Sequence, residues 1–241
     1  MRHFSLALLS AISAIALPQF ASAADLPVKA PAYRAPPVVT QTWTGCYIGG
    51  NVGAGWSHTD VNDEIDGSPI ATLDANAVVG GGQIGCDYQF AGNWLIGVQG
   101  MYDASGLKAD TTSVANTPGV TLHGSIPWFA TATARLGYVV VPNWLVYAKG
   151  GGAWTHTDAS LSVTATGTVF DTGSFDQSGW TAGGGAEWMF APNWSVFAEY
   201  DYLGFRDKTV TLASGANIGT VHQNVQVALI GLNFRFTGLF H

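Results

Sequence analysis

The stretch "APNWSVFAEYDYL" (residues 191–203) is repeated in outline by "VPNWLVYAKGGGA" (141–153) and by "AGNWLIGVQGMYD" (91–103). An Asn-Trp pair therefore recurs at fixed spacing, after Gly or Pro and before a run of alternating character. Gly, Pro and Asn favour turns, and a fixed-period repeat defines the unit of the architecture. Each unit consists of a tight turn, a strand, a polar segment of roughly twenty residues and a returning strand.

Repetition of this unit predicts eight strands with short and long connections in alternation. All tight turns then lie at one end of the sheet and all long connections at the other. We expect the strands at about 44–56, 78–90, 94–104, 126–138, 144–155, 179–190, 194–205 and 224–236.

Alternate residues of a strand share a face. In 128–138, 144–154 and 180–190, one face carries no charge and has an aromatic residue at each end, whereas the other is small and polar with one charge. Ten residues of tilted strand rise roughly 25 Å, the height of the apolar band of a transmembrane barrel between its aromatic girdles. The predicted membrane-interface girdle consists of Trp94, Trp144, Trp194, Trp128, Trp154, Trp180, Tyr138 and Phe190.

The predicted fold is all-β: an eight-stranded antiparallel up-and-down transmembrane β-barrel with short periplasmic turns and long extracellular loops. A soluble barrel with its apolar face inward is the alternative. Only 10% of the residues are charged, so the polar face is too poor in charge to solubilise a protein. No run beyond residue 42 approaches the 18 apolar residues that a membrane helix needs.

The N-terminal region predicts export. Residues 1–23 combine a short basic head, an apolar run and the small residues "ASA", which is typical of a cleaved secretory signal peptide. Residues 24–42 contain four prolines and predict an extended periplasmic linker. Residues 43–241 remain for the barrel domain.

The segments "WTGCYIGGNVGAGW" (43–56), "GGGQIGCDYQF" (80–90) and "ALIGLNFRF" (228–236) resemble small outer-membrane β-barrel proteins of alphaproteobacteria. These are the surface-antigen, RopB-type porin-family proteins with an OmpA-like eight-stranded barrel. The start "ADLPVKAP" after the signal peptide is also similar. The family usually ends at the aromatic residue that closes the last strand, here Phe236 or, if the strand continues, Phe240.

The resemblance implies a Gram-negative outer-membrane location, insertion by the barrel-assembly machinery and no enzyme activity. We expect outer-membrane lipid and lipopolysaccharide as partners and no catalytic residue, cofactor or metal. The net charge of −7, with its few basic residues scattered, argues against nucleic-acid binding. The sequence names no ligand for the long connections.

The inward-facing charges fall at repeated depths in the predicted strands. An eight-stranded barrel has an interior only wide enough to be filled with side chains, so we predict a plug of ion pairs. A proton or ion path is the alternative. The predicted network contains Asp87, Arg135, Lys149, Glu187, Glu199, Asp201 and Arg235.

Four histidines, His58, His123, His156 and His222, fall near the long-connection end. Imidazole is a common metal ligand, but nothing in the sequence brings these side chains together. We interpret them as polar loop residues rather than as a metal or haem site.

Cys46 and Cys86 are the only cysteines, and export would place them in an oxidising compartment. If Trp56 and Asn76 flank the first long connection symmetrically, the same register sets Cys46 opposite Cys86, both facing outward. We predict a disulfide; two free buried thiols are the alternative, and a register slip of one residue would forbid the bond.

These observations favour a structural outer-membrane protein that contributes to envelope integrity and to surface contact. A narrow diffusion pore and a loop-mediated adhesin or receptor are the competing hypotheses.

Overall fold

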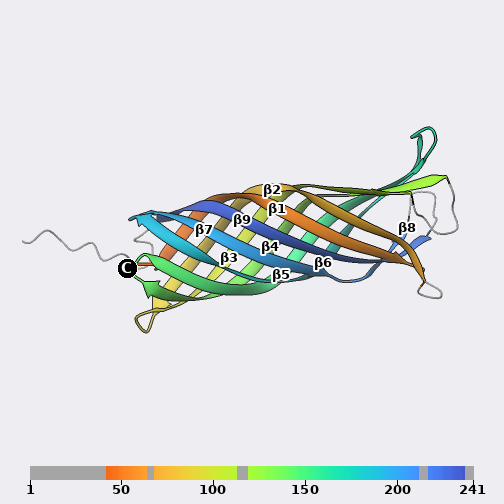
Figure 1. Cartoon of the computed structure of the whole chain (residues 1–241). Coiled ribbons are helices and arrows are strands. Elements are labelled where there is room, and N and C mark those ends of the chain that lie inside the picture. The colour runs from red at the N-terminus through yellow and green to blue at the C-terminus, as the bar shows by residue number, and fades with distance from the viewer. Residues whose placement is uncertain (1–41, 64–67, 113–118, 212–216, 237–241) are drawn as a thin grey trace, which may run out of the picture. The chain divides into compact units, whose positions relative to one another are not determined.

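The computed structural model describes residues 42–63, 68–112, 119–211 and 217–236 (Figure 1). The strands are β1 Gly45–Asn62, β2 Pro69–Phe90, β3 Trp94–Thr111, β4 Val120–Val141, β5 Trp144–Val163, β6 Val169–Ala191, β7 Trp194–Phe205, β8 Lys208–Thr211 and β9 Asn217–Phe236. No helix in these ranges is long and apolar enough to cross a membrane.

The strands form a closed antiparallel ring. Each strand from β1 to β7 pairs with the next one in the chain, and β9 pairs with both β7 and β1. β8 is a short strand that pairs with β9, so eight strands remain in the ring. The predicted eight-stranded up-and-down barrel is therefore confirmed.

The Asn-Trp repeat lies at the tight-turn end of the barrel, where β2 joins β3, β4 joins β5 and β6 joins β7. Each Trp begins a strand, and the carbonyl of the preceding Asn accepts a hydrogen bond from the strand beyond. Asn93 accepts from Val139 at 2.7 Å, Asn143 from Met189 at 2.9 Å and Asn193 from Arg235 at 2.7 Å. The repeat thus ties every tight turn to the neighbouring hairpin.

The strands are longer than the sequence analysis predicted, because most of the polar segments expected to be loops are paired strand. β1 and β2, for example, stay paired from Gly45↔Asp87 to Asn62↔Pro69. The connections at the first three hairpins therefore shrink to residues 63–68, 112–119 and 164–168.

Apolar residues inside the barrel hold these extensions together. Val61, Ala71, Leu73, Leu122 and Val221 form a buried cluster near the long-connection end. Here the apolar side chains face inward and the polar ones outward, which reverses the arrangement closer to the tight turns. The polar outer face accounts for the loop-like composition.

A bulge at Pro127 interrupts β4. In the β4–β5 ladder the register shifts between Ser125 and Trp128 of β4, and in the β3–β4 ladder it shifts between Ala104 and Leu107 of β3. Proline has no N–H to donate to a ladder, so it is tolerated at such bulges. Beyond the bulge, even-numbered residues such as Ile126 face inward instead of odd-numbered ones.

Candidate functional site

The interior near the tight-turn end is filled by two arginines and two carboxylates that are at most 3% exposed. Arg235 lies 2.9 Å from Asp87 and 3.1 Å from Glu187. Arg135 lies 3.0 Å from Glu187 and 3.4 Å from Asp87. The two positive charges match the two negative ones, so this first layer carries no net charge.

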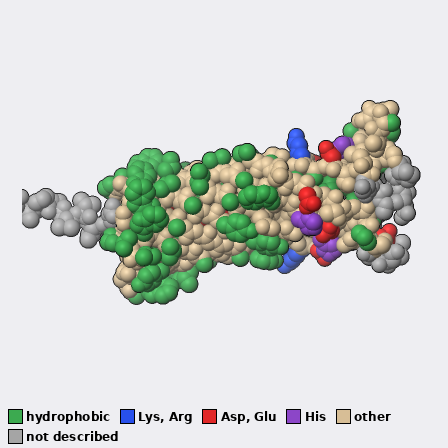
Figure 2. All heavy atoms as spheres, viewed as in Figure 1, with side chains coloured by type: hydrophobic (Ala, Val, Ile, Leu, Met, Phe, Trp, Pro, Cys, Tyr) green, Lys and Arg blue, Asp and Glu red, His purple; other side chains and the backbone are tan. Residues whose placement is uncertain are grey.

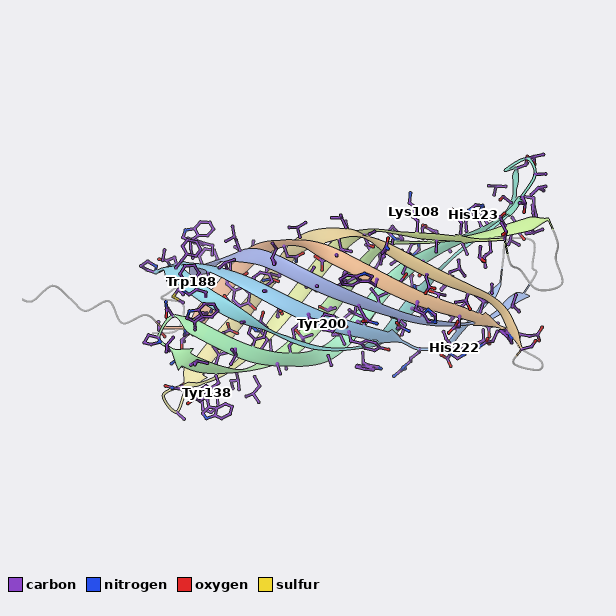
Figure 3. The ribbon with its side chains drawn as sticks, viewed as in Figure 1. Lys108, His123, Tyr138, Trp188, Tyr200 and His222 are labelled. Atoms are coloured by element: carbon purple, nitrogen blue, oxygen red, sulfur yellow. A yellow bond between two sulfur atoms is a disulfide. The ribbon has the colours of Figure 1, made fainter. Side chains whose placement is uncertain are left out.

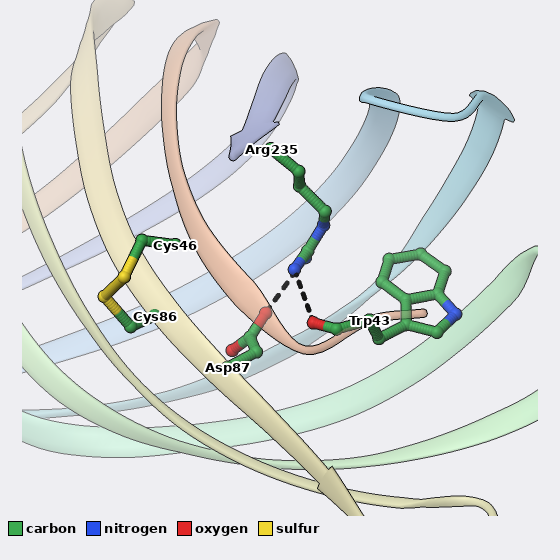
Figure 4. The surroundings of a disulfide bond; sticks show 5 residues. All are labelled: Trp43, Cys46, Cys86, Asp87 and Arg235. Atoms are coloured by element: carbon green, nitrogen blue, oxygen red, sulfur yellow. Dashed lines mark hydrogen bonds and ion pairs between the residues drawn. A yellow bond between two sulfur atoms is a disulfide. The ribbon is translucent and has the colours of Figure 1, made fainter. Parts of the chain in front are cut away.

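Trp43, the residue two positions before β1, covers the first layer (Figure 4). Its backbone carbonyl accepts a hydrogen bond from Arg235 at 3.0 Å, and the Arg235 guanidinium lies 4.8 Å from the centroid of its ring system. The indole N–H donates to the carbonyl of Pro142 at 3.1 Å. Strand alternation could not predict this role, because Trp43 precedes β1 and belongs to neither face of a strand.

A second layer of charge lies on the adjacent inward positions. The Lys149 ammonium lies 2.5 Å from Glu199 and 2.9 Å from Asp201. It also donates to the side-chain oxygen of Gln99 at 3.3 Å, and the Tyr147 hydroxyl donates to Glu199 at 2.7 Å. One ammonium group therefore forms ion pairs with two carboxylates. Removing it would leave both of them without a cation in this layer.

All seven residues of the predicted charge network lie inside the barrel, at most 5% exposed. Glycines on the inward face leave space for them and for the aromatic residues beside them. A Cβ atom added at Gly97 would overlap the Asp87 carboxylate, and one added at Gly183 would overlap Asp201. The small residues of the inward face are thus required for the packing of the charged side chains inside the barrel.

Toward the long-connection end the interior becomes apolar, which corrects the expectation of a small and polar inward face throughout. The buried cluster there includes Val79, Leu107, Phe129, Leu203 and Phe205. A cavity of about 50 Å³ remains between this cluster and the extensions beyond it. Asp103 is also buried in this region, beside the side-chain amide of Asn51.

The predicted disulfide between Cys46 and Cys86 is confirmed (Figure 4). The two residues are direct partners in the β1–β2 register, and their Cα atoms are 3.9 Å apart. Trp56 pairs with Asn76, as the symmetric register predicts. The bond links β1 to β2 close to the charge layers.

The predicted girdle residues lie on the outside of the barrel. Trp94, Trp144, Trp194, Tyr138 and Phe190 are 41–49% exposed near the tight turns, and Trp154 and Trp180 are exposed toward the other end. Figure 3 shows Tyr138 and Trp188 pointing away from the wall at the tight-turn end. Trp128 is partly covered, because it lies between Tyr102 and His156 in two stacked ring contacts.

Beyond the outer aromatic residues, four outward-facing histidines each pair with an aspartate. Three of these aspartates lie on the neighbouring strand, and the fourth, Asp207, lies between β7 and β8. The Nδ1 atom lies 2.5–2.6 Å from the carboxylate in every pair. We call these four pairs the His–Asp collar: His58–Asp74, His123–Asp110, His156–Asp176 and His222–Asp207. Figure 2 shows charged and histidine side chains gathered in a band of this surface.

The collar was missed because the histidines were assigned to loops. The register arithmetic that paired the cysteines would also have set His58 opposite Asp74, since both pairs belong to the β1–β2 ladder. The hydrogen bond to Asp74 raises the pKa of His58 above its usual value, and the hydrogen bond to Asp176 raises the pKa of His156. Both imidazoles therefore take up a proton more readily than a free histidine does.

Several known outer-membrane proteins are similar to this chain. The chain is 30% identical over 233 residues to the 31 kDa outer-membrane immunogenic proteins of Brucella melitensis biotype 1 and Brucella suis biovar 1, over 90% of this chain and 93% of each relative. The crystal structure of the outer membrane protein OprG from Pseudomonas aeruginosa aligns with a TM-score of 0.45 at 11% identity, over 81% of this chain and 97% of that chain. Residues 4–236 match the outer membrane protein β-barrel domain family. The chain therefore belongs to this family, and its location is the Gram-negative outer membrane.

Proposed function

We propose that this protein is a closed, non-enzymatic barrel that contributes to envelope integrity and to surface contact through its long connections. The observation that carries the proposal is the filled interior. Two layers of ion pairs and an apolar cluster occupy the space between the ends. Barrels with aqueous channels use 16 or more strands, and this ring has eight.

The outer wall supports a specific membrane arrangement. We place the tight turns in the periplasm, the two rings of aromatic residues at the membrane interfaces, and the long connections outside the cell. Lipid and lipopolysaccharide would then surround the wall, and the barrel-assembly machinery would insert it. Trp and Tyr favour such interfaces because their rings are amphipathic.

Single-channel recording in planar bilayers tests the closed barrel. We expect no stable conductance from the purified monomer under conditions in which a 16-stranded porin, as positive control, conducts. Stable open-channel currents from the monomer would instead support the narrow diffusion pore.

The cellular role needs a separate experiment. We expect a deletion strain to become more sensitive to detergent, and the wild-type gene to restore resistance. A variant with the three hairpin connections replaced by short Gly-Ser turns should also restore resistance but lose any binding to host cells or matrix. Undiminished binding by this variant would contradict a role of those connections in surface contact.

A further inference from the structure

The outward-facing charge of this barrel is concentrated at the level of the His–Asp collar. The interior contains Arg135, Lys149 and Arg235, whereas the other described basic residues, Lys108, Arg206 and Lys208, are exposed on the extensions. His58 and His156 each lie two residues beyond an outer aromatic residue, Trp56 and Trp154 respectively, on the same face of their strands. Since such aromatic residues sit at headgroup depth, the collar lies against the headgroups.

We infer that the His–Asp collar is a docking surface for anionic phosphate headgroups of the surrounding lipid, and that histidine protonation switches it on. The inference rests on the proposed membrane arrangement. It goes beyond the closed barrel in two ways: it names anionic headgroups as the partner, and it makes their binding depend on pH.

The net charge of the collar together with the charged residues beside it gives the direction of the switch. Six aspartates and three basic residues leave −3 while the histidines are neutral, and four protonated histidines bring the total to +1. The aspartates are the four collar partners with Asp60 and Asp158; the basic residues are Lys108, Arg206 and Lys208. Anionic headgroups are therefore repelled in the neutral state and attracted in the protonated one.

Each histidine faces defined groups on the strands around it. His58 contacts Asp60 at 3.2 Å in addition to Asp74, and a groove beside it contains Lys108. His156 contacts Asp158 at 3.4 Å in addition to Asp176, and its ring stacks on Trp128. These carboxylates favour the imidazolium form and hold it at the surface.

The other two pairs have their own neighbours. The second ring nitrogen of His123 lies 2.7 Å from the Ser162 hydroxyl, and Lys108 and Asp158 line the groove beside the ring. His222 is paired with Asp207 and stands opposite Asp60 in the β1–β9 register. Figure 3 shows Lys108, His123 and His222 on the outer wall. The four pairs are thus spread around the barrel rather than gathered at one point.

The test uses lipid quenching of tryptophan fluorescence. The purified full-length protein is reconstituted in phosphatidylcholine vesicles that contain increasing fractions of brominated phosphatidylglycerol or, as reference, brominated phosphatidylcholine. We expect the preference for phosphatidylglycerol to rise on the order of tenfold between pH 8 and pH 5. The reference lipid corrects for direct effects of protonation on Trp128.

Two variants separate the switch from other causes. Replacing all four collar histidines with Gln (H58Q, H123Q, H156Q and H222Q) keeps a polar partner for each aspartate and should abolish the rise. Replacing them with Lys should give the high preference already at pH 8. No pH response in the wild type, an unchanged response in the Gln variant, or a low preference of the Lys variant at pH 8 would each overturn the inference.

Two further readouts identify what has failed if the result is negative. The shift in gel mobility on heating shows whether the protein has inserted as a folded barrel. If an inserted protein is quenched equally by both lipids, headgroup docking at the collar is refuted, but the proposed closed barrel is not. Inorganic phosphate at constant ionic strength is the last arm. If millimolar phosphate abolishes the lipid preference, the collar binds small anions in general, and lipid docking is refuted.

Discussion

At the scale of single residues, the stability of the barrel depends on the partners of each buried charged side chain. Lys149 is the only basic residue in contact with Glu199 and Asp201 in the described structure. Breaking a buried ion pair by removing one partner costs more than the pair contributes, because an uncompensated charge is left behind. The buried lysine is therefore far more sensitive to substitution than an exposed one.

Lys149→Met should destabilise the barrel by about 3–5 kcal/mol. Lys108→Met, in an exposed position on the outer wall, should change stability by less than about 0.5 kcal/mol. Urea unfolding in lipid vesicles, followed by tryptophan fluorescence, measures both. Equal effects would show that the second layer contributes nothing specific.

Neighbouring residues on one strand should differ sharply because they face different environments. Ala132 is exposed on the outer wall, whereas Thr131 is 4% exposed and faces the interior. Ala132→Arg should cost about 2–4 kcal/mol if the site lies near the bilayer midplane, and Thr131→Ser should cost little. Refolding yield and unfolding free energy in lipid are the measurements; equal tolerance would contradict the face assignment.

At the scale of elements, the first hairpin is held by a covalent bond as well as by its ladder. Cys46 and Cys86 are 40 residues apart in the chain. A bond that closes a loop of this length should stabilise the folded state by about 3–4 kcal/mol through loop-closure entropy.

The double variant Cys46→Ala/Cys86→Ala should lose that stability and become insensitive to reductant. Mass spectrometry after alkylation without reduction should detect no free thiol in the wild type. Two alkylated cysteines would refute the bond in the purified protein.

The hairpin extensions should respond to pH through the collar. Because the folded-state pKa of His58 and of His156 is raised, the stabilisation is fully present below the usual histidine pKa of about 6.5. It is lost as the pH rises through the higher folded-state value. Hydrogen exchange corrected for its intrinsic pH dependence should show the β1–β2 and β5–β6 extensions better protected in acid.

A matched control for that experiment is His58→Gln, which removes titration from the first hairpin alone. The pH response should vanish at β1–β2 and persist at β5–β6. If both hairpins kept their response, another group would have to be responsible.

At the scale of the whole molecule, stability depends on closing the ring. β1 pairs with β9 from Cys46↔Phe236 to Asn62↔Thr220. β9 ends at Phe236, while Phe240 lies outside the described residues. The closing strand therefore supplies a ladder along the full length of β1.

The purified protein should migrate at a different apparent mass before and after boiling in detergent, because a closed barrel resists unfolding until it is heated. A chain truncated after Asp207, which lacks β8 and β9, cannot close the ring and should show a single mobility. A heat-dependent shift in the truncated chain would contradict the need for closure.

The sequence alone determined the strand number, the outward and inward faces near the tight turns and the register of the first hairpin. These follow from local rules: a period of two along each strand, turn-forming residues at fixed spacing, and register arithmetic across one connection. The cysteine pair and the inward position of all seven network charges could be predicted for this reason.

Only the tertiary structure decided where the strands end, how the interior is filled and what the histidines contact. In the proposed membrane arrangement, the outer surface of each strand passes from lipid to water. The segments in water are polar in sequence and resemble loops, although their inward residues pack as a core. The bulge at Pro127 reverses the alternation of β4. Trp43 and Asp87 belong to the same plug as Arg235 only because β9 closes on β1. Such contacts depend on ring closure between residues far apart in the chain, and no local pattern records that geometry.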